Sequence, residues 1–327
     1  MRVILWVCLA LGIVWGGYWF VGSRAVDQGV VRWFADTAAS GAIATNQGVS
    51  IAGFPSRFDL TVTEPHLADP ATGWGWQAPF AQIFSMTWKP WHLIAALPND
   101  QEIDAPDQKI KLHSSAMKGS LRMYPSTALT FAELVVEGHD MTATSDLGWT
   151  IAAKSLLLAI AEVPTQQNAQ RLGLDATDIA PDASLTALMP DLGDKIETLH
   201  LDATLALSAP INLHFSGGGP SLQGITLRDF HGTWGKLKVT ATGEITQAPE
   251  GYADGKIDFR IEDWRDVPKL LAALGVVLPG MGDSIERGFE VLAKAGPDPE
   301  VLMLSLTFHK GRMSLGPLPL GPAPMLN

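Results

Sequence analysis

The first hydrophobic stretch of the chain is continuous rather than periodic. Val3 to Gly22 is a run of 20 residues without a charge, and Arg2 and Arg24 flank it. A helix that rises about 1.5 Å per residue covers about 30 Å over this run, which is the thickness of the hydrocarbon core of a bilayer. The pattern predicts a transmembrane anchor over residues 1–23.

Two readings of this apolar run are open, a retained anchor and a cleaved signal peptide. A signal peptide needs small residues before its cleavage site, whereas this run ends in bulky residues, among them Trp15, Tyr18 and Trp19. Aromatic rings at that end suit the interface of a membrane, so we favour the retained anchor. Arg2 and the amino terminus form a small positive cluster, which predicts a cytoplasmic N-terminus and a C-terminal domain outside the cytoplasm.

Helical periodicity follows the apolar run. Val26, Val30 and Phe34 recur every four residues, and Gly41 is a suitable stop. We therefore expect a juxtamembrane helix that continues the anchor, within a segment covering residues 24–45.

From Gly48 onward the apolar and polar residues alternate, which is typical of antiparallel strands with one buried face. The clearest strands are Arg57–Thr63, Lys109–His113, Leu199–Leu207, Leu237–Ala241, Lys256–Glu262 and Val301–Phe308. Ser155–Ala161 fits a strand or a helix, and we favour a strand. Two late helices are expected, over Pro268–Leu278 and from Asp283 to about Ala295.

These elements predict a mainly β (α+β) fold. An N-terminal transmembrane helix precedes a large, mostly antiparallel, curved β-sheet ectodomain with a few packed helices. Residues 46–327 form this β-rich domain, and the polar, Pro- and Gly-punctuated segment 164–194 is a soft boundary between two sub-lobes.

Composition narrows the classes of function and compartment. The formal net charge is −11, which disfavours nucleic acid as a partner because an acidic chain repels phosphate. Cys8 is the only cysteine, so an intramolecular disulfide is excluded. A bacterial periplasm fits this composition, and a disulfide-stapled ectodomain does not.

Sequence motifs for catalysis or cofactor binding are lacking. The H-E-x-x-H, G-x-S-x-G and Walker A patterns do not occur. The segment from Gly73 to Ala78, GWGWQA, matches a dinucleotide-binding pattern formally, but its Trp residues would block a pyrophosphate and no βαβ unit surrounds it. We expect no cofactor and no catalytic residue.

The histidines are scattered, and a few stand beside carboxylates. His200 and Asp202 share a strand face, and His214 is a candidate neighbour across the sheet. Further candidate acid–base groups are His139 with Asp140, and His231 with Asp229. A metal site and ordinary strand-surface polarity both fit these residues. We favour the second, so we expect no metal site and no activity that requires His200, His214 or His231.

Tryptophan usage offers a different candidate site. The candidate apolar groove consists of Trp74, Trp76, Phe80, Phe84, Trp88 and Trp91. A corner of the hydrophobic core is the simpler explanation of this cluster, and a wide apolar groove or a membrane-facing surface would also favour Trp.

A family resemblance rests on three short motifs. They are Gly53-Phe-Pro-Ser-Arg-Phe-Asp-Leu60, Lys89-Pro-Trp-His-Leu-Ile94 and the Gly- and Pro-rich ending from Leu315 to Pro324. In these the chain resembles an alphaproteobacterial family known as domain of unknown function 2125, although Ser56 departs from the aromatic residue expected there. The resemblance implies a membrane-tethered periplasmic protein and carries over no catalytic residues. Its layout is similar to that of AsmA-like proteins, which are implicated in phospholipid transport and envelope upkeep; this second link is an analogy of fold.

The sequence thus predicts a single-pass protein of the bacterial inner membrane, held through Val3–Gly22, with its C-terminal domain in the periplasm. We expect a non-enzymatic role in envelope maintenance, with membrane lipids as partners on an apolar β-groove, because a sheet with one apolar face must cover it. The alternatives are a scaffold or assembly factor for envelope complexes and, third, a hydrolase with an unrecognised site.

Overall fold

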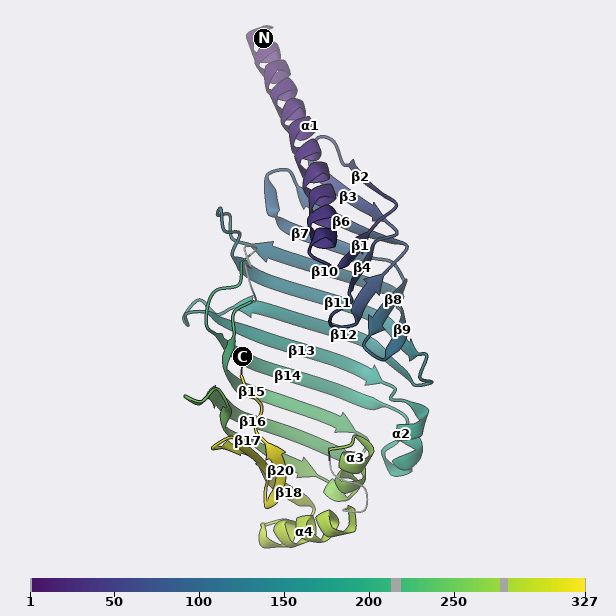
Figure 1. Ribbon diagram of the computed structural model, residues 1–327, viewed down its shortest axis with the longest axis vertical. Helices are drawn as coiled ribbons and strands as arrows, with labels where there is room; N and C mark the ends of the chain where they lie inside the picture. Colours follow the sequence, from purple (N-terminus) through teal and green to yellow (C-terminus); the bar gives the residue numbers. More distant parts are fainter. Residues whose placement is uncertain (1, 213–218, 277–281, 327) are drawn as a thin grey trace. The chain divides into compact units, whose positions relative to one another are not determined.

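The computed structural model describes residues 2–212, 219–276 and 282–326 (Figure 1). The chain divides into two compact units. Unit 1 comprises residues 1–125 and 136–148, and unit 2 comprises residues 126–135 and 149–327. Antiparallel strands dominate both, as the alternation predicts. The segment 164–194, expected as a boundary, lies within unit 2, where it contains the whole of β13 (Ala169–Ile179) and α2 (Ala183–Leu188).

Helix α1 (Arg2–Ala39) is continuous, so the expected membrane span and the expected juxtamembrane helix are one element. It is long and apolar enough to cross a membrane, and little of its apolar part is buried in the protein. The helix ends shortly before Gly41, whose φ of 98° is accessible to glycine at little cost. The predicted stop is therefore confirmed.

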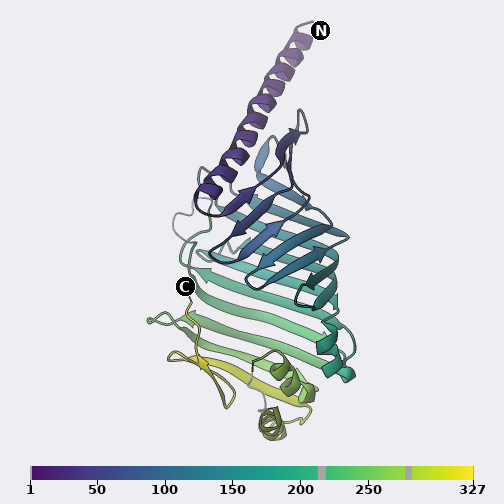
Figure 2. The same cartoon turned by 45° about the vertical axis from the view of Figure 1, so that its right-hand side comes forward.

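The strands of unit 1 form two series of antiparallel pairs (Figure 2). The first series runs in the order β2 (Gly48–Ala52), β3 (Arg57–Thr63), β6 (Phe80–Met86), β7 (Lys89–Leu97) and β10 (Ala116–Met123). The second runs in the order β1 (Ile43–Thr45), β4 (His66–Asp69), β5 (Trp74–Gln77), β8 (Asp100–Ala105), β9 (Gln108–His113) and β11 (Phe131–Ser145).

The core of unit 1 forms where the last turns of α1 meet these strands. Phe34 of α1 is buried with Ala44, Leu60 and Val62. Phe58, Leu60 and Val62 alternate along β3 and are all buried, as the sequence pattern predicts. Burial of alternate residues against Phe34 fixes which face of β3 points inward, because a slip of one residue would reverse the faces.

The turn between β2 and β3 explains the first motif of the family resemblance. Gly53 has a φ of 96°, and its carbonyl accepts backbone hydrogen bonds from Ser56 and Arg57 at 3.2 and 2.9 Å. A Cβ at Gly53 would lie 2.8 Å from the carbonyl oxygen of Arg57. Both the left-handed backbone and the close approach thus require glycine here.

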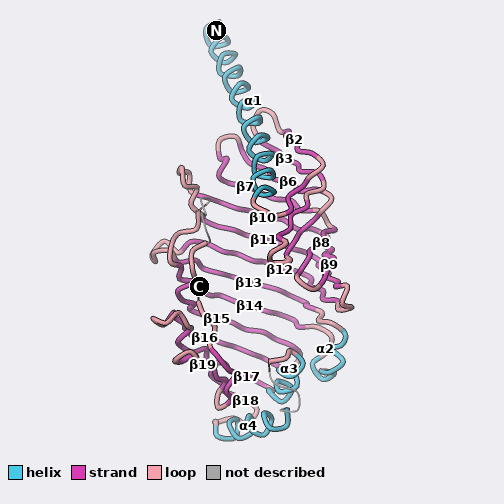
Figure 3. The backbone as a smooth tube through the Cα atoms, in the orientation of Figure 1, coloured by secondary structure: helices cyan, strands magenta, loops and turns pink. Residues whose placement is uncertain are grey.

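Unit 2 is an antiparallel meander in which each strand pairs with the next (Figure 3). Its strands after β11 are β12 (Thr150–Glu162), β13, β14 (Ile196–Leu207), β15 (Leu222–Trp234), β16 (Leu237–Gln247), β17 (Ala253–Glu262), β18 (Val301–His309), β19 (Arg312–Leu315) and β20 (Leu318–Pro322). Every strand expected in this region is present, and the ambiguous Ser155–Ala161 lies in a strand, β12.

Short helices cover one part of this meander. They are α2, the 3₁₀ turns η1 (Pro190–Leu192) and η2 (Trp264–Asp266), α3 (Val267–Ala273) and α4 (Gly282–Ala295). Trp264 and, on α4, Ile285 and Phe289 are almost fully buried in one cluster with Leu302 and Leu304 of β18. The helices therefore pack on the apolar side of the later strands, as the sequence predicts.

Helix α3 is shorter than the Pro268–Leu278 prediction. It ends at Ala273, and Gly275 follows with a φ of 69°. The N–H of Val276 donates to the carbonyl of Leu271 at 2.9 Å, which caps the helix end. The prediction missed this glycine because the apolar run continues past it; Leu278 itself lies outside the described residues.

Candidate functional site

The register of unit 2 separates an apolar face from a polar face. Residues directly opposite each other in antiparallel strands share a face. One such row joins Leu158, Leu174, Leu201 and Phe230 across β12 to β15. We define the apolar face as Leu156, Leu158, Ile160, Leu172, Leu174, Leu199, Leu201, Leu205, Ile225, Leu227 and Phe230.

The apolar face is only partly buried. All eleven of its side chains keep partial exposure to solvent, and none belongs to the buried clusters around Trp264 or Phe308. Those clusters cover the face farther along the meander, over β16 to β19. A large apolar surface that stays accessible marks a site of interaction in most soluble proteins.

A β-bulge in β15 keeps the apolar face continuous. Leu227 pairs with Ala203 and Phe230 with Leu201, so both point to the apolar face although they are three residues apart. The extra residue sits at Arg228 and Asp229, which together oppose one residue of β16. The bulge places Asp229 opposite Asp202, on the polar face.

The histidine cluster, defined as His200, Asp229 and His231, lies on this polar face. His200 and His231 are paired across β14 and β15, and their rings stack with centroids 4.7 Å apart and planes 23° apart. Asp229 Oδ2 lies 4.0 Å from His200 Nε2 and 3.4 Å from His231 Nδ1. One ligand atom from each residue fits within 4.8 Å of the other two, as in a site for a metal ion.

A further carboxylate orients the cluster. Asp175 of β13 is paired with His200, and its Oδ1 lies 2.6 Å from His200 Nδ1. This hydrogen bond raises the pKa of His200 against the opposing effect of burial, and Asp175, Asp229 and Asp202 add to it through charge. Asp202 is held separately by Arg171, which donates two hydrogen bonds of 2.9 and 2.8 Å and lowers the pKa of that carboxyl group.

Aromatic residues gather where α1 meets the loops of unit 1. The Trp15 ring lies 6.4 Å from Trp88 and 5.9 Å from Tyr18, whose hydroxyl donates to the carbonyl of Thr87 at 2.8 Å. We define the aromatic collar as Trp15, Tyr18, Phe20, Phe54 and Trp88, all of which are substantially exposed.

Trp19 attaches α1 to β3. It is 8% exposed, and its indole N–H donates to the carbonyl of Arg57 at 2.6 Å. Its ring stacks on Phe58, with centroids 6.3 Å apart. Sequence reasoning assigned the aromatic residues of α1 to a membrane interface, but it could not show that strand and loop residues join them.

The six residues of the candidate apolar groove are distributed over both strand series of unit 1. Trp74 and Trp76 belong to β5, and the indole N–H of Trp76 donates to Gln101 at 2.9 Å. Phe80 and Phe84 on β6 are paired with Thr63 and Asp59, opposite to the buried face of β3. Trp91 on β7 is partly buried, and Trp88 is in the collar. The groove therefore stays a prediction.

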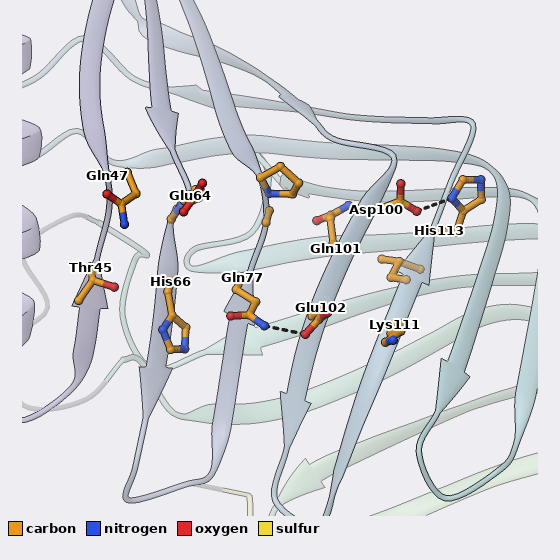
Figure 4. Close-up of a pocket in the computed structure, with 14 residues that line it drawn as sticks. Thr45, Gln47, Glu64, His66, Gln77, Asp100, Gln101, Glu102, Lys111 and His113 are labelled. Carbon is orange, nitrogen blue, oxygen red and sulfur yellow. Dashed lines mark hydrogen bonds and ion pairs between the residues drawn. The ribbon is translucent and has the colours of Figure 1, made fainter.

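A hollow of about 600 Å³ in unit 1 is lined mostly by polar and charged residues (Figure 4). Gln77 donates to Glu102 at 2.6 Å, and Asp100 lies 2.7 Å from His113 Nδ1. These pairs, with His66 beside them, give the hollow a lining unsuited to an acyl chain.

The remaining sequence candidates do not converge into a site with one another. His139 and Asp140 are exposed on β11, where Asp140 accepts a hydrogen bond from the Ser115 hydroxyl at 2.8 Å. The segment from Gly73 to Ala78 forms a turn and β5, without the helix that a dinucleotide site needs. His214 lies outside the described residues.

Comparison with models of protein families gives a match over most of the chain. The model of a family described as uncharacterized protein conserved in bacteria, DUF2125, matches residues 19–324, which is nearly the whole chain. Among curated proteins, none matches the chain.

Proposed function

The chain belongs to this bacterial family, and from that premise we propose that it is a non-enzymatic, inner-membrane-anchored protein of envelope maintenance whose apolar face binds lipid acyl chains. The single observation that carries the proposal is the apolar face itself: eleven aliphatic or aromatic side chains on one face of four paired strands keep partial exposure.

The physical argument for a lipid concerns the kind of surface. Covering apolar surface contributes about 25 cal/mol for each Å² removed from water. The four strands β12 to β15 are separated by three inter-strand spacings of about 4.8 Å, so the strip that they form is about 14 Å wide. A flexible, elongated and wholly apolar occupant matches such a strip, because a polar ligand would lose hydrogen bonds to water and find none on Leu and Ile side chains.

Attachment to a membrane supports the same partner. Helix α1 is apolar along the length that a bilayer requires. The aromatic collar lies where α1 meets the loops of unit 1, with Trp88 50% and Phe54 56% exposed, as expected for rings that lie among lipid headgroups. We infer that the bilayer reaches this collar, so the protein is permanently close to a source of lipid.

Photo-crosslinking in living cells tests lipid binding on the intact protein. A benzophenone amino acid is placed at Leu201, on the apolar face, and at Thr198, on the opposite face of the same strand. Phospholipid attached at Leu201 and not at Thr198, detected by mass spectrometry, is the expected result. A third position at Leu11 in α1 provides the positive control, since it should contact lipid in any membrane-spanning chain.

Other outcomes select the alternatives. Crosslinks from Leu201 to proteins, without lipid, would support the scaffold or assembly factor and overturn the lipid proposal. Failure to label Leu11 would overturn the membrane anchor as well. The periplasmic location has its own test: an alkaline phosphatase fused to the C-terminus should be active, and mature protein should retain residues before Ser23.

A further inference from the structure

The polar face of unit 2, opposite to the apolar face, carries the histidine cluster. We propose that His200, Asp229 and His231 bind one divalent transition-metal ion, with Zn²⁺ as the best match. Two imidazoles and one carboxylate are a common ligand set for zinc and leave a fourth position for water.

The ligand atoms lie close enough to share one ion after a modest movement of side chains. Zinc lies about 2.0–2.2 Å from His nitrogen and carboxylate oxygen atoms, so two ligands of a tetrahedral site are about 3.3–3.6 Å apart. Asp229 Oδ2 lies 3.4 Å from His231 Nδ1, within this range, and 4.0 Å from His200 Nε2, slightly beyond it. All three ligand atoms lie within 4.8 Å of one another, so rotation of the partly exposed side chains would bring them to one ion.

The surroundings have the features of an outer ligand shell. The Asp175 carboxylate lies 2.6 Å from His200 Nδ1, so this nitrogen carries the proton and Nε2 is left to face Asp229. A carboxylate behind a ligating imidazole is the usual arrangement in zinc sites, where it fixes the ring and its tautomer.

Local backbone structure supplies the third ligand. Without the bulge at Arg228 and Asp229, residues 227 and 230 would point to opposite faces of β15. The bulge keeps Leu227 and Phe230 on the apolar face and places Asp229 on the polar face beside the histidines. Bulges commonly re-aim a side chain beside a site, and this one serves both faces of the sheet.

Zinc titration of the full chain in mild detergent, at about pH 8 where protons compete less with the metal for its ligands, tests the site. Calorimetry should show one equivalent of Zn²⁺ bound, and Co²⁺ should give a visible absorption band from nitrogen ligands. His231→Ala and Asp229→Asn should each abolish this binding. Asp175→Asn should weaken it about 10- to 100-fold, as loss of an outer-shell partner does.

His309→Ala is the matched control. His309 is an exposed histidine of unit 2 with one carboxylate partner, Asp254, at 3.2 Å. This variant should bind Zn²⁺ as the parent does. The proposal is overturned if the parent binds no Zn²⁺ below millimolar concentration, or if His231→Ala binds as tightly as His309→Ala. Thermal melts in chelator, which should be alike for all variants, separate loss of the site from loss of the fold.

Discussion

Replacing Phe289 with alanine should remove a large part of the stability of unit 2. Phe289 is 1% exposed, and its ring meets that of Trp264 edge-on, with centroids 6.2 Å apart and planes 77° apart. Truncation of a fully buried Phe to Ala costs about 3–5 kcal/mol, and the lost aromatic pair is part of that cost. Phe289→Leu fills most of the space and should cost about 1 kcal/mol.

The matched control is on the same helix. Val291 is 68% exposed, so Val291→Ala should change the free energy of unfolding by about 0.5 kcal/mol or less. Urea unfolding of the full chain in mild detergent, followed by circular dichroism, measures all three variants. Equal midpoints for Phe289→Ala and Val291→Ala would refute the packing of α4 on β18. Lipid crosslinking at Leu201 should survive in Phe289→Ala, because the apolar face lies outside this cluster.

Three further predictions concern other parts of the chain. Trp76→Gln should lower the free energy of unfolding by about 3 kcal/mol, because Trp76 is partly buried and its indole is hydrogen-bonded to Gln101. Trp88→Gln should lower it by about 0.5 kcal/mol or less, because Trp88 is half exposed. Equal losses of stability in urea unfolding would contradict this. Hydrogen bonds from the Ser184 hydroxyl and from the backbone N–H groups of Thr150 and Ser184 lower the pKa of Asp182, which caps α2, to about 2. In the unfolded chain the pKa of an Asp is about 3.9, so ionised Asp182 stabilises the fold above about pH 4. The difference in melting temperature between the parent and Asp182→Ala should therefore narrow as the pH falls toward 2. A difference independent of pH would argue against this cap. A Cβ at Gly243 would lie 2.3 Å from the carbonyl oxygen of Lys256, so Gly243→Ala should lower the free energy of unfolding by about 1–3 kcal/mol. The control is Gly173→Ala, which should be tolerated because the nearest atom to a Cβ there is 4.0 Å away. Equal melting temperatures for the two variants would refute the clash.

The strands could be predicted from sequence wherever one face is buried and the other is not. Arg57–Thr63 is such a case, since Phe58, Leu60 and Val62 all point inward. Ser155–Ala161 was ambiguous because Leu157, on the polar face and 39% exposed, interrupts the alternation between Leu156 and Leu158. Its assignment depends on pairing with β13, which is not a local property of the sequence.

The complete histidine cluster could not be predicted, because His200 comes from β14 whereas Asp229 and His231 come from β15. His200 meets His231 only in the observed register of β14 and β15. A local signal did exist: in the alternating strand around Leu227-Arg-Asp-Phe230, two apolar residues stand three apart, which indicates a bulge. Sequence reasoning noted the acidic and histidine residues there but did not use this spacing.

The continuity of α1 limits how unit 1 can move relative to this helix. The 38-residue helix is about 57 Å long, and Trp19 and Phe34 fix it to the strands of unit 1. If the 17 residues from Ser23 to Ala39 were a flexible linker, the strands of unit 1 could move over a distance of about 20–25 Å from its start. With α1 in a membrane, as proposed, unit 1 would instead tilt and rotate with the helix as one body, so the helix would set the height of unit 1 above the bilayer and its orientation.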